Sequence, residues 1–569
     1  MFTNEKIIKP ERKFFPEDEK FDTWVIVEKT LNEFLNEKIS SLNELIRFIE
    51  KISEYKSILS EQFARKYILK TRFADNEEYS KDFNGFYANI VSKSSPYDFK
   101  IKVKICENEF FNELPDDFYA VFKKSYKNEI DFFREENIPL MIEEQKISNG
   151  YDKIVSGLSV DYNEKEYTVT QLMSFQNNLD RNVREETWKM ASSKYYDQKD
   201  ELNNLFDTLK ELRIKMANNN GYENYRDYMH LKKKRFDYTP EDNFQFHDSV
   251  EKVVIPFLKE QNEKRKKDLN LDNLRPWDTT VSTDGKVLKP FDTIDEFIEK
   301  SLKVLNKIKP EFAINLEKMK NSDHLDLENR KGKAPGGYNY PLHETGAPFI
   351  FMNAVGTKTD VRTLLHESGH AMHSFSAKNY IVDYKSTPHE VSEVASMAME
   401  LLTLDYWTEF YPNEEDYKSA KKEQLLSTLK ILPWVMIIDA FQQWIYTNPN
   451  HTAEERAEYF GKLMDRFNDG VDWTGLEEFK KYVWLKQLHV FRAPFYYIEY
   501  AIAQLGALGI YKNYKEDKEK AVKLYEEFLK VGYSKSVPEI YKAGGIEFNF
   551  SKEYISSLVE FIKNELINL

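Results

Sequence analysis

The chain has 569 residues and a formal net charge of −14, and hydrophobic residues make up 41 % of it. That length is too great for one compact core, so we expect at least two lobes, each with enough apolar residues for its own core. The acidic balance argues against a protein built to hold phosphate backbones, which needs a basic excess, so we expect no nucleic-acid partner.

Cysteine usage and apolar runs bear on the compartment. The single cysteine, Cys106, excludes an intrachain disulfide and fits a reducing environment. The N-terminal segment has no apolar core of signal-peptide length, and the apolar run at 431–438 is far shorter than the ~20 residues that span a membrane. We therefore expect a soluble, cytoplasmic protein with no membrane partner. Two basic runs, at 232–235 and 264–267, adjoin acidic residues and are interpreted as solvated faces.

The N-terminal third reads as helical. Glycine and proline are scarce, at 19 each, which favours long helices over a turn-rich β architecture. Residues 20–150 repeat apolar positions at three- and four-residue spacing and predict consecutive amphipathic helices. Within 157–175, two β-type runs flank the polar residues 163–166 and predict a small hairpin. Helices then resume, and we place a loose boundary near residue 195.

A turn-rich segment follows much later, at 330–356, where glycine and proline are frequent. The run PFIFMN within it, at 348–353, predicts a short strand between breakers. An extended edge strand beside a catalytic helix could pair with a peptide backbone by strand addition. An ordinary surface loop is the alternative on local sequence alone.

The next segment, 357–378, predicts a helix that gathers histidines. Thr357 and Asp360 fit a capping box at its start. On such a helix His366 and His370 lie one turn apart on one face, about 6 Å along the axis. Two imidazoles at that spacing can hold one Zn²⁺, and Glu367 then points beside the ion, where it can deprotonate a water molecule. The alternative is a pair of buried, hydrogen-bonded histidines.

His373, three residues beyond His370, is rotated away from that face, and we interpret it as a packing or supporting residue rather than a ligand.

A catalytic zinc needs a third protein ligand and an open position. The segment STPHEVSEVASMAMELL predicts another helix, with Pro388 at its first position and Glu390 as the capping-box acid after Thr387.

The third ligand is expected on this second helix. Glu393 and Glu400 are seven residues apart and share one face, in an otherwise small and apolar surface. Buried carboxylates need partners, and a metal ion is one. Spacing alone does not choose between the two glutamates, and both being exposed acids is the alternative.

The segments GKAPGGY, HESGH and VSEVASMAME together resemble the M3 family of zinc metallopeptidases, and most closely its oligoendopeptidase F group. The resemblance implies one Zn²⁺ held by His366, His370 and Glu393, with Glu367 as the base. Glu400 matches a second glutamate of the family pattern and would orient a ligand.

The resemblance extends to residues 487–507, QLHVFRAPFYYIEYAIAQLGA. There the family carries a histidine followed by tyrosines that face the scissile carbonyl, and the best matches are His489, Tyr497 and Tyr500. The neighbouring Tyr496 remains an alternative for the role of these tyrosines. From the residues alone, a phenol can donate a hydrogen bond to a developing oxyanion, but aromatic core packing is the alternative.

The resemblance also implies a mainly α-helical, two-lobed clamshell of the zincin type, with a deep central channel and a small β element near the active site. Residues 1–195 would form the N-terminal helical lobe and 196–569 the catalytic domain. The implied function is that of a zinc metalloendopeptidase that cuts internal bonds of short, unstructured oligopeptides by Glu-assisted attack of a zinc-bound water. The alternatives are a zincin-type carboxypeptidase and an inactive peptide-binding protein. The oligomeric state stays open.

Overall fold

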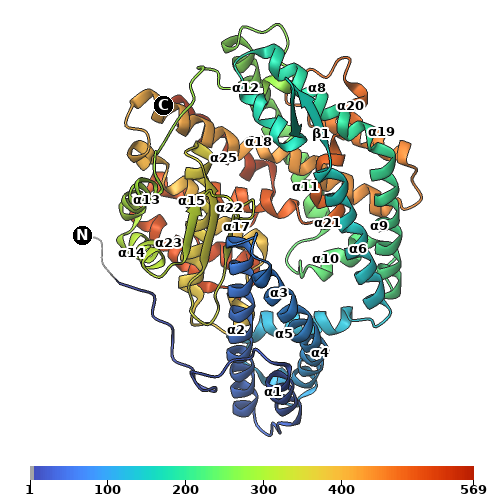
Figure 1. Ribbon diagram of the computed structural model, residues 1–569, viewed down its shortest axis with the longest axis vertical. Helices are drawn as coiled ribbons and strands as arrows, with labels where there is room; N and C mark the ends of the chain where they lie inside the picture. Colours follow the sequence, from blue (N-terminus) through green and yellow to red (C-terminus); the bar gives the residue numbers. More distant parts are fainter. Residues whose placement is uncertain (1–4) are drawn as a thin grey trace. The chain divides into compact units, whose positions relative to one another are not determined.

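The computed structural model describes residues 5–569 and is mostly helical, with five short strands among these residues (Figure 1). The expectation of a mainly α fold with small β elements is confirmed. The described chain forms two compact units. The first comprises residues 5–131, 288–422 and 503–548, and the second comprises 132–287, 423–502 and 549–569. The boundary expected near residue 195 lies inside the second unit, and an independent folding unit ending there stays a prediction.

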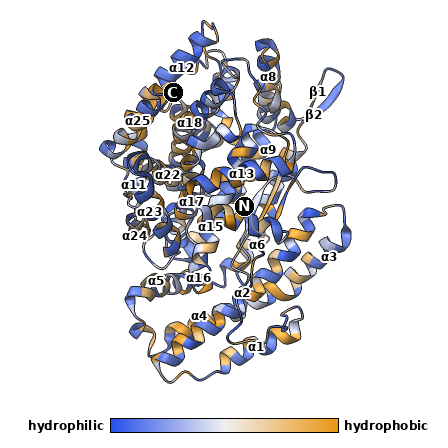
Figure 2. Cartoon of the chain, turned by 90° about the vertical axis from the view of Figure 1, so that its left-hand side faces the viewer, coloured by the Kyte–Doolittle hydropathy of each residue, from blue (hydrophilic) through white to orange (hydrophobic). Residues whose placement is uncertain are grey.

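The first unit holds the predicted metal site. Its elements are α1 (Trp24–Asn36), α2 (Leu42–Arg72), α3 (Glu77–Phe86), α4 (Ser92–Glu107), α5 (Asp116–Phe132), α13 (Ile294–Ile308), α14 (Pro310–Asn321), β3 (Leu325–Glu328), β4 (Tyr338–Tyr340), β5 (Phe349–Ala354), α15 (Lys358–Ala377), α16 (Val382–Lys385), α17 (His389–Leu402), α23 (Lys518–Val531) and α24 (Val537–Ala543). Its longest N-terminal helix, α2, shows why these segments fold as predicted. Leu45, Phe48 and Ile52 are buried at three- and four-residue spacing, and Ser41 caps the helix by accepting from the backbone of Glu44. Figure 2 shows both hydrophobic and hydrophilic residues along this helix.

A three-stranded sheet with the strand order β3-β5-β4 lies against α15. β5 pairs parallel with β3 and antiparallel with β4, so it is the central strand. The strand expected at PFIFMN is therefore confirmed, but its expected edge position is wrong. The physical reason is its unbroken apolar run, Phe349–Met352, which is buried throughout, as in central strands covered on both faces. β3 and β4 are the two edge strands.

The second unit contains the predicted hairpin. Its elements are α6 (Asn137–Ser156), β1 (Ser159–Tyr162), β2 (Lys165–Thr168), α7 (Val169–Leu172), α8 (Arg181–Asp197), α9 (Lys199–Asn219), α10 (Tyr225–Lys232), α11 (Pro240–Ser249), α12 (Ile255–Asp268), α19 (Ala453–Arg466), α20 (Glu477–Lys481), α21 (Leu488–Arg492) and α25 (Lys552–Ile567). β1 and β2 pair antiparallel around a two-residue turn at Asn163 and Glu164, both with positive φ. Such a turn matches the right-handed twist of the strands.

Two further helices, α18 (Glu414–Thr447) and α22 (Ile498–Glu516), contain the points where the division into units falls. Among the described helices, α18 alone is long and apolar enough to cross a membrane. However, 78 % of its most apolar window is buried inside the protein. Its apolar composition is thus accounted for by packing in the interior.

The interpretation of the two basic runs as solvated faces is only partly right. In the run at 232–235 the three lysines are half-buried and Arg235 is buried. In the run at 264–267 Lys264 and Lys267 are exposed, whereas Arg265 is half-buried and donates to the carbonyl oxygen of Asp278 at 2.8 Å. The charge pattern of a run does not reveal which Lys or Arg side chain will be buried and hydrogen-bonded, because the acceptors come from other segments of the chain.

Candidate metal centre and active site

α15 begins as the sequence predicts. The Thr357 hydroxyl accepts from the backbone N–H of Asp360, and the Asp360 carboxylate accepts from the N–H of Thr357 at 2.7 Å and of Val355 at 3.0 Å. This capping box fixes the first turn. Leu364 and Leu365 are fully buried in the core of the unit. The helix therefore presents His366 and His370 together on a neighbouring, half-buried face.

α17 begins one residue later than expected. Pro388 is extended, with ψ 151°, and stands before the helix with no side-chain capping bond. The expected capping box of Thr387 and Glu390 is therefore wrong. Glu390 is buried instead, and its backbone carbonyl accepts from the hydroxyl of Tyr541 at 2.7 Å.

Close packing joins α15 to α17. A Cβ atom added at Gly369 would lie 2.5 Å from the carbonyl oxygen of Ala395 and 2.6 Å from the Cα of Ser396. Only glycine permits this approach of two helix backbones. The glycine between the two histidines thus has a packing role, and the approach brings Glu393 to the histidine face.

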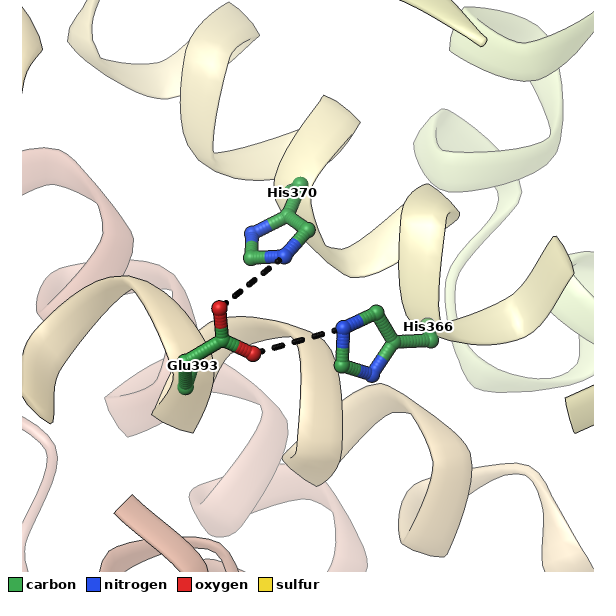
Figure 3. Close-up of side chains that lie close together, drawn as sticks. All are labelled: His366, His370 and Glu393. Carbon is green, nitrogen blue, oxygen red and sulfur yellow. Dashed lines mark ion pairs between the residues drawn. The ribbon is translucent and has the colours of Figure 1, made fainter. Parts of the chain in front are cut away.

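Figure 3 shows the resulting cluster, with the carboxylate of Glu393 facing both imidazoles. His366 Nε2 lies 3.3 Å from one Glu393 oxygen, and His370 Nε2 lies 3.9 Å from the other. The donor atoms of the three residues all lie within 4.8 Å of one another, so they could hold one metal ion. Two ligands of a tetrahedral zinc are about 3.3 Å apart, given bonds of about 2.0–2.1 Å. The donor set and its spacing fit such an ion.

Glu400 contacts the other nitrogen of His366. Its carboxylate oxygen lies 2.6 Å from His366 Nδ1, and both atoms are part-buried. With the Nδ1 proton donated to this carboxylate, Nε2 is left with the lone pair that a metal ligand needs. Glu393 and Glu400 therefore have different partners, a distinction that their spacing in the sequence leaves open.

The charges at the cluster pair His366 with two glutamates. Burial acts to lower the pKa of His366, but Glu393 and Glu400 raise it well above 6.5, so a metal ion bound there would displace a proton from this imidazole. Burial favours the neutral form of Glu393, but His366 and His370 lower its pKa to about 2, so it stays a carboxylate. Burial lowers the pKa of His370 to about 3, which keeps that imidazole neutral and able to coordinate.

Glu367 is half-buried beside these residues. Burial and the nearby Glu393 and Glu400 raise its pKa to about 7, although His366 acts to lower it. A general base works best when its pKa lies near the working pH. The backbone carbonyl of Glu367 accepts from Asn339 Nδ2 at 3.0 Å, which fastens the edge strand β4 to this turn of α15.

His373 is buried away from the cluster, as expected for a packing residue. Its ring lies 6.4 Å from that of Phe528, and its Nε2 has no hydrogen-bond partner among the described residues. Burial lowers its pKa to about 4, so the ring is neutral.

In the second unit, four rings from 487–507 gather into one aromatic cluster. The ring of His489 lies 4.8 Å from Tyr497 and 6.2 Å from Tyr500, and stacks on Tyr496 at 5.5 Å. Tyr497 is the last residue before α22, and Tyr500 lies in the first turn of that helix. Burial raises the pKa of Tyr497 to about 12, so its phenol keeps its proton and can donate.

A hydrogen-bond chain orients His489. The indole N–H of Trp434 donates to Gln487 Oε1 at 2.9 Å, and the amide nitrogen of Gln487 lies 2.6 Å from His489 Nδ1. Because an indole can only donate, it fixes which end of the Gln487 amide faces His489. Nδ1 then accepts, and neutral His489 carries its proton on Nε2. Burial lowers the pKa of His489, which favours this neutral form.

The family model for "Peptidase family M3" matches residues 174–560. The chain belongs to this family. Family M3 comprises peptidases that are generally metal-dependent, in keeping with the donor cluster on α15 and α17. The resemblance read from HESGH and the neighbouring segments is thereby confirmed.

Relatives in family M3 extend over nearly the whole chain. An oligoendopeptidase F homolog of Borreliella burgdorferi is 25 % identical over 94 % of this chain and 90 % of its own length. The group B oligopeptidase PepB of Streptococcus agalactiae is 22 % identical over 92 % of this chain and 88 % of its own.

Solved structures show the same fold. A structure titled "PZ PEPTIDASE A with inhibitor 2" has a TM-score of 0.86 at 24 % identity and covers 98 % of this chain and 99 % of its own. A putative oligoendopeptidase F from Bacillus anthracis has a TM-score of 0.83 at 22 % identity, over 98 % of this chain and 99 % of its own. The family M3 fold thus accounts for both units of the chain.

Several residues that support the site in this family M3 chain were not predicted from the sequence. Gln487 and Trp434 orient His489, and Asn339 joins β4 to α15, yet none stands out by type or spacing. Gln487 is the first residue of the segment QLHVF, two positions before His489, and this nearness is the one signal in the sequence. The other two act across long stretches of sequence.

Proposed function

We propose that this chain is a zinc-dependent endopeptidase that hydrolyses internal bonds of short, unstructured peptides. The observation that carries the proposal is the cluster of His366, His370 and Glu393, whose donor atoms lie within 4.8 Å of one another. Two imidazoles and a carboxylate are a donor set typical of a catalytic zinc, with a position left for water or substrate. Zinc bound there supplies Lewis-acid chemistry, because it polarises a carbonyl and lowers the pKa of water from about 15.7 towards ~7.

The chain's own residues carry the proton transfers. Glu367 accepts a proton from the attacking water and later passes it to the leaving amine. Burial raises the pKa of Glu367 above its ordinary value, which supports transient protonation of this carboxylate. Glu400 holds His366 through Nδ1, which would leave Nε2 available to hold the ion.

Three residues from the segment 487–507 would assist at the substrate carbonyl. Membership of family M3 supports this role for Tyr497, Tyr500 and His489, because the family motif falls on these positions. Protonated phenols can donate hydrogen bonds to a developing oxyanion. The Nε2–H of His489, left free to donate by its contact with Gln487, can do the same.

The substrate backbone is proposed to align along β4 (Tyr338–Tyr340). This strand lies at the edge of its sheet and is fastened to Glu367 through Asn339. Strand addition uses backbone hydrogen bonds, so it supports a loose preference for residues around the cut bond. The role first expected of PFIFMN passes to β4, since β5 has strands on both sides.

The substrates would be short peptides acted on in the cytoplasm, without nucleic acid or membrane as partners. The names of the oligopeptidase relatives support peptide substrates. A narrow central channel, as the resemblance implies, would exclude folded proteins.

The test is cleavage of a quenched fluorescent peptide of about ten residues, with products mapped by mass spectrometry. We expect internal cleavage that a chelator abolishes and that zinc restores. Removal of single terminal residues would point to a carboxypeptidase instead. The same cleavable sequence placed inside a stably folded domain should resist, and equal rates for the free and embedded forms would contradict the size limit.

A further inference from the structure

The turn that leads into α22 has an unusual backbone. Phe495 has φ +62°, in the left-handed region that residues other than glycine rarely adopt. Its ring is buried. Tyr497 follows two residues later, and Tyr500 lies within the first turn of the helix. A backbone in a sparsely populated conformation persists only where its surroundings fix it. We therefore expect neighbouring groups to hold Phe495 in place.

Two buried polar side chains hold this residue from both ends. The N–H of Phe495 donates to Gln442 Oε1 at 2.9 Å, and its carbonyl accepts from the guanidinium of Arg235. Gln442 is fully buried on α18, and the Arg235 side chain is 1 % exposed. Both backbone polar groups of the strained residue are therefore satisfied by side chains that have little freedom to move.

Arg235 makes a second bond into the same segment. Its guanidinium donates to Glu499 Oε1 at 2.7 Å, and Glu499 stands between the two tyrosines with 4 % exposure. Lys233 lies 3.5 Å from the same carboxylate oxygen. One buried nitrogen, Nη2 of Arg235, thus donates both to the turn before α22 and to the first turn of that helix.

The residue before Arg235 also has a left-handed backbone. After α10, Lys234 has φ +59° and its N–H bonds to the carbonyl of Leu231 at 2.8 Å. The N–H of Arg235 then bonds to the carbonyl of His230 at 3.2 Å. This tight reversal turns the last cation of the basic run inwards, which is why Arg235 is buried while its lysine neighbours are half-buried.

A second buried arginine holds the start of the same segment. Arg213 donates to the carbonyls of Val490, at 3.1 Å, and Phe491, and to the hydroxyl of Tyr446 at 2.8 Å. The backbone between His489 and α22 is therefore held at both ends by guanidinium groups. Of the two, Arg235 bonds to Phe495 and Glu499, the residues two positions before and after Tyr497.

We propose that Arg235 is a positioning residue that sets the place of Tyr497 and Tyr500 by fixing the Phe495 turn and the Glu499 carboxylate. This inference rests on the catalytic role given to the tyrosines under the proposed function. Arg235 itself touches neither substrate nor reacting atoms in this account.

The test compares Arg235→Met and the milder Arg235→Lys with Tyr497→Phe and Tyr500→Phe in the full-length enzyme. Arg456→Met is the matched control, because Arg456 is equally buried in the same unit but bonds to Asn203 and Asp207, away from this turn. Two quantities are measured: kcat and KM on a fluorescent peptide, and hydrogen exchange of the peptides covering 490–502.

We expect Arg235→Met to lower kcat at least tenfold with KM within twofold and metal content unchanged. Exchange at 490–502 should accelerate in Arg235→Met and not in Arg456→Met, and Arg235→Lys should fall between. In a variant that already carries both Tyr497→Phe and Tyr500→Phe, Arg235→Met should add little further loss of kcat, since it acts through those two phenols. If Arg235→Met does not fold, Arg235→Lys carries the same comparison.

The inference is overturned if Arg235→Met slows turnover no more than Arg456→Met while the tyrosine variants are slow. It is also overturned if Arg235→Met lowers kcat by the same factor in the variant that lacks both phenols as in the wild type. Unchanged exchange at 490–502 would also overturn it. A different pattern marks failure of the proposed function: both tyrosine variants then keep the wild-type kcat, and the catalytic part of the inference falls with it.

Discussion

Gly369 on α15 and Ala395 on α17 are in backbone contact, and this contact sets the distance between the histidines and Glu393. A Cβ at Gly369 would lie 2.5 Å from the Ala395 carbonyl oxygen, closer than such atoms can approach. Alanine normally stabilises a helix by about 1 kcal/mol relative to glycine. Here we expect Gly369→Ala to destabilise the protein by about 1–3 kcal/mol, as overpacking does, and to weaken metal binding because α17 is pushed away.

The matched control is Gly85→Ala, in the helix α3, where an added Cβ meets nothing within 4 Å. Thermal unfolding and zinc titration of both variants check the prediction. Gly85→Ala should be neutral or stabilising. A Gly369→Ala protein as stable as wild type, with unchanged zinc affinity, would show that the helix contact does not determine the site.

Glu400 is predicted to orient His366 rather than to bind the ion. Glu400→Ala removes the acceptor 2.6 Å from His366 Nδ1, and loss of such a supporting partner typically lowers metal affinity 10–100-fold. Competition with a chromogenic chelator measures this. If Glu400→Ala abolishes zinc binding while Glu393→Ala retains it, the two glutamates have been assigned the wrong way round.

Glu367→Gln is predicted to keep the metal and lose turnover. The amide has nearly the same shape as the carboxyl group, but it cannot accept a proton, and general-base catalysis typically contributes 10²–10⁴-fold. Zinc per chain and kcat on a short peptide should be measured on the same preparation. Turnover within a few-fold of wild type would remove Glu367 from the proposed mechanism.

Asp326 in β3 is predicted to make stability depend on pH. It pairs with Arg72 at 2.9 Å, Arg330 at 2.6 Å and Lys333 at 2.8 Å. Burial favours its neutral form, but hydrogen bonds from Arg330 and Lys333 lower its pKa from 3.8 to about 2. A depressed carboxyl pKa gives stability that is present above pH ~4 and lost as pH falls towards 2.

The shift of Asp326 corresponds to about 2 kcal/mol, since one pKa unit is worth about 1.4 kcal/mol. Urea unfolding of wild type and Asp326→Asn at several pH values checks this. The gap between the two proteins should be widest above pH ~4 and narrow by about 2 kcal/mol near pH 2. A gap that does not change with pH would mean that the carboxylate charge contributes nothing to stability.

Local patterns in the sequence predicted the elements that local interactions determine. The capping box of Thr357 and Asp360 depends on a three-residue spacing, and the pairing of His366 with His370 depends on the helical repeat. Both are present as predicted. The hairpin at 159–168 likewise follows from a polar turn between two short β-type runs.

Long-range contacts determine the features that the sequence left open or predicted wrongly. β5 is central because β3 and β4 supply its neighbours, and neither short strand carries a recognisable pattern. Arg235 is buried because Phe495 and Glu499, more than 250 residues away, accept from it. The choice between Glu393 and Glu400 depends on which nitrogen of His366 each one faces.

The most direct test of the account is the metal content of purified protein, measured by mass spectrometry of the elements alongside peptide cleavage. We predict close to one zinc per chain in the wild type, and loss of both zinc and cleavage in Glu393→Ala. Wild-type protein that contains no divalent metal yet cleaves the peptide at full rate in a chelator would contradict the account.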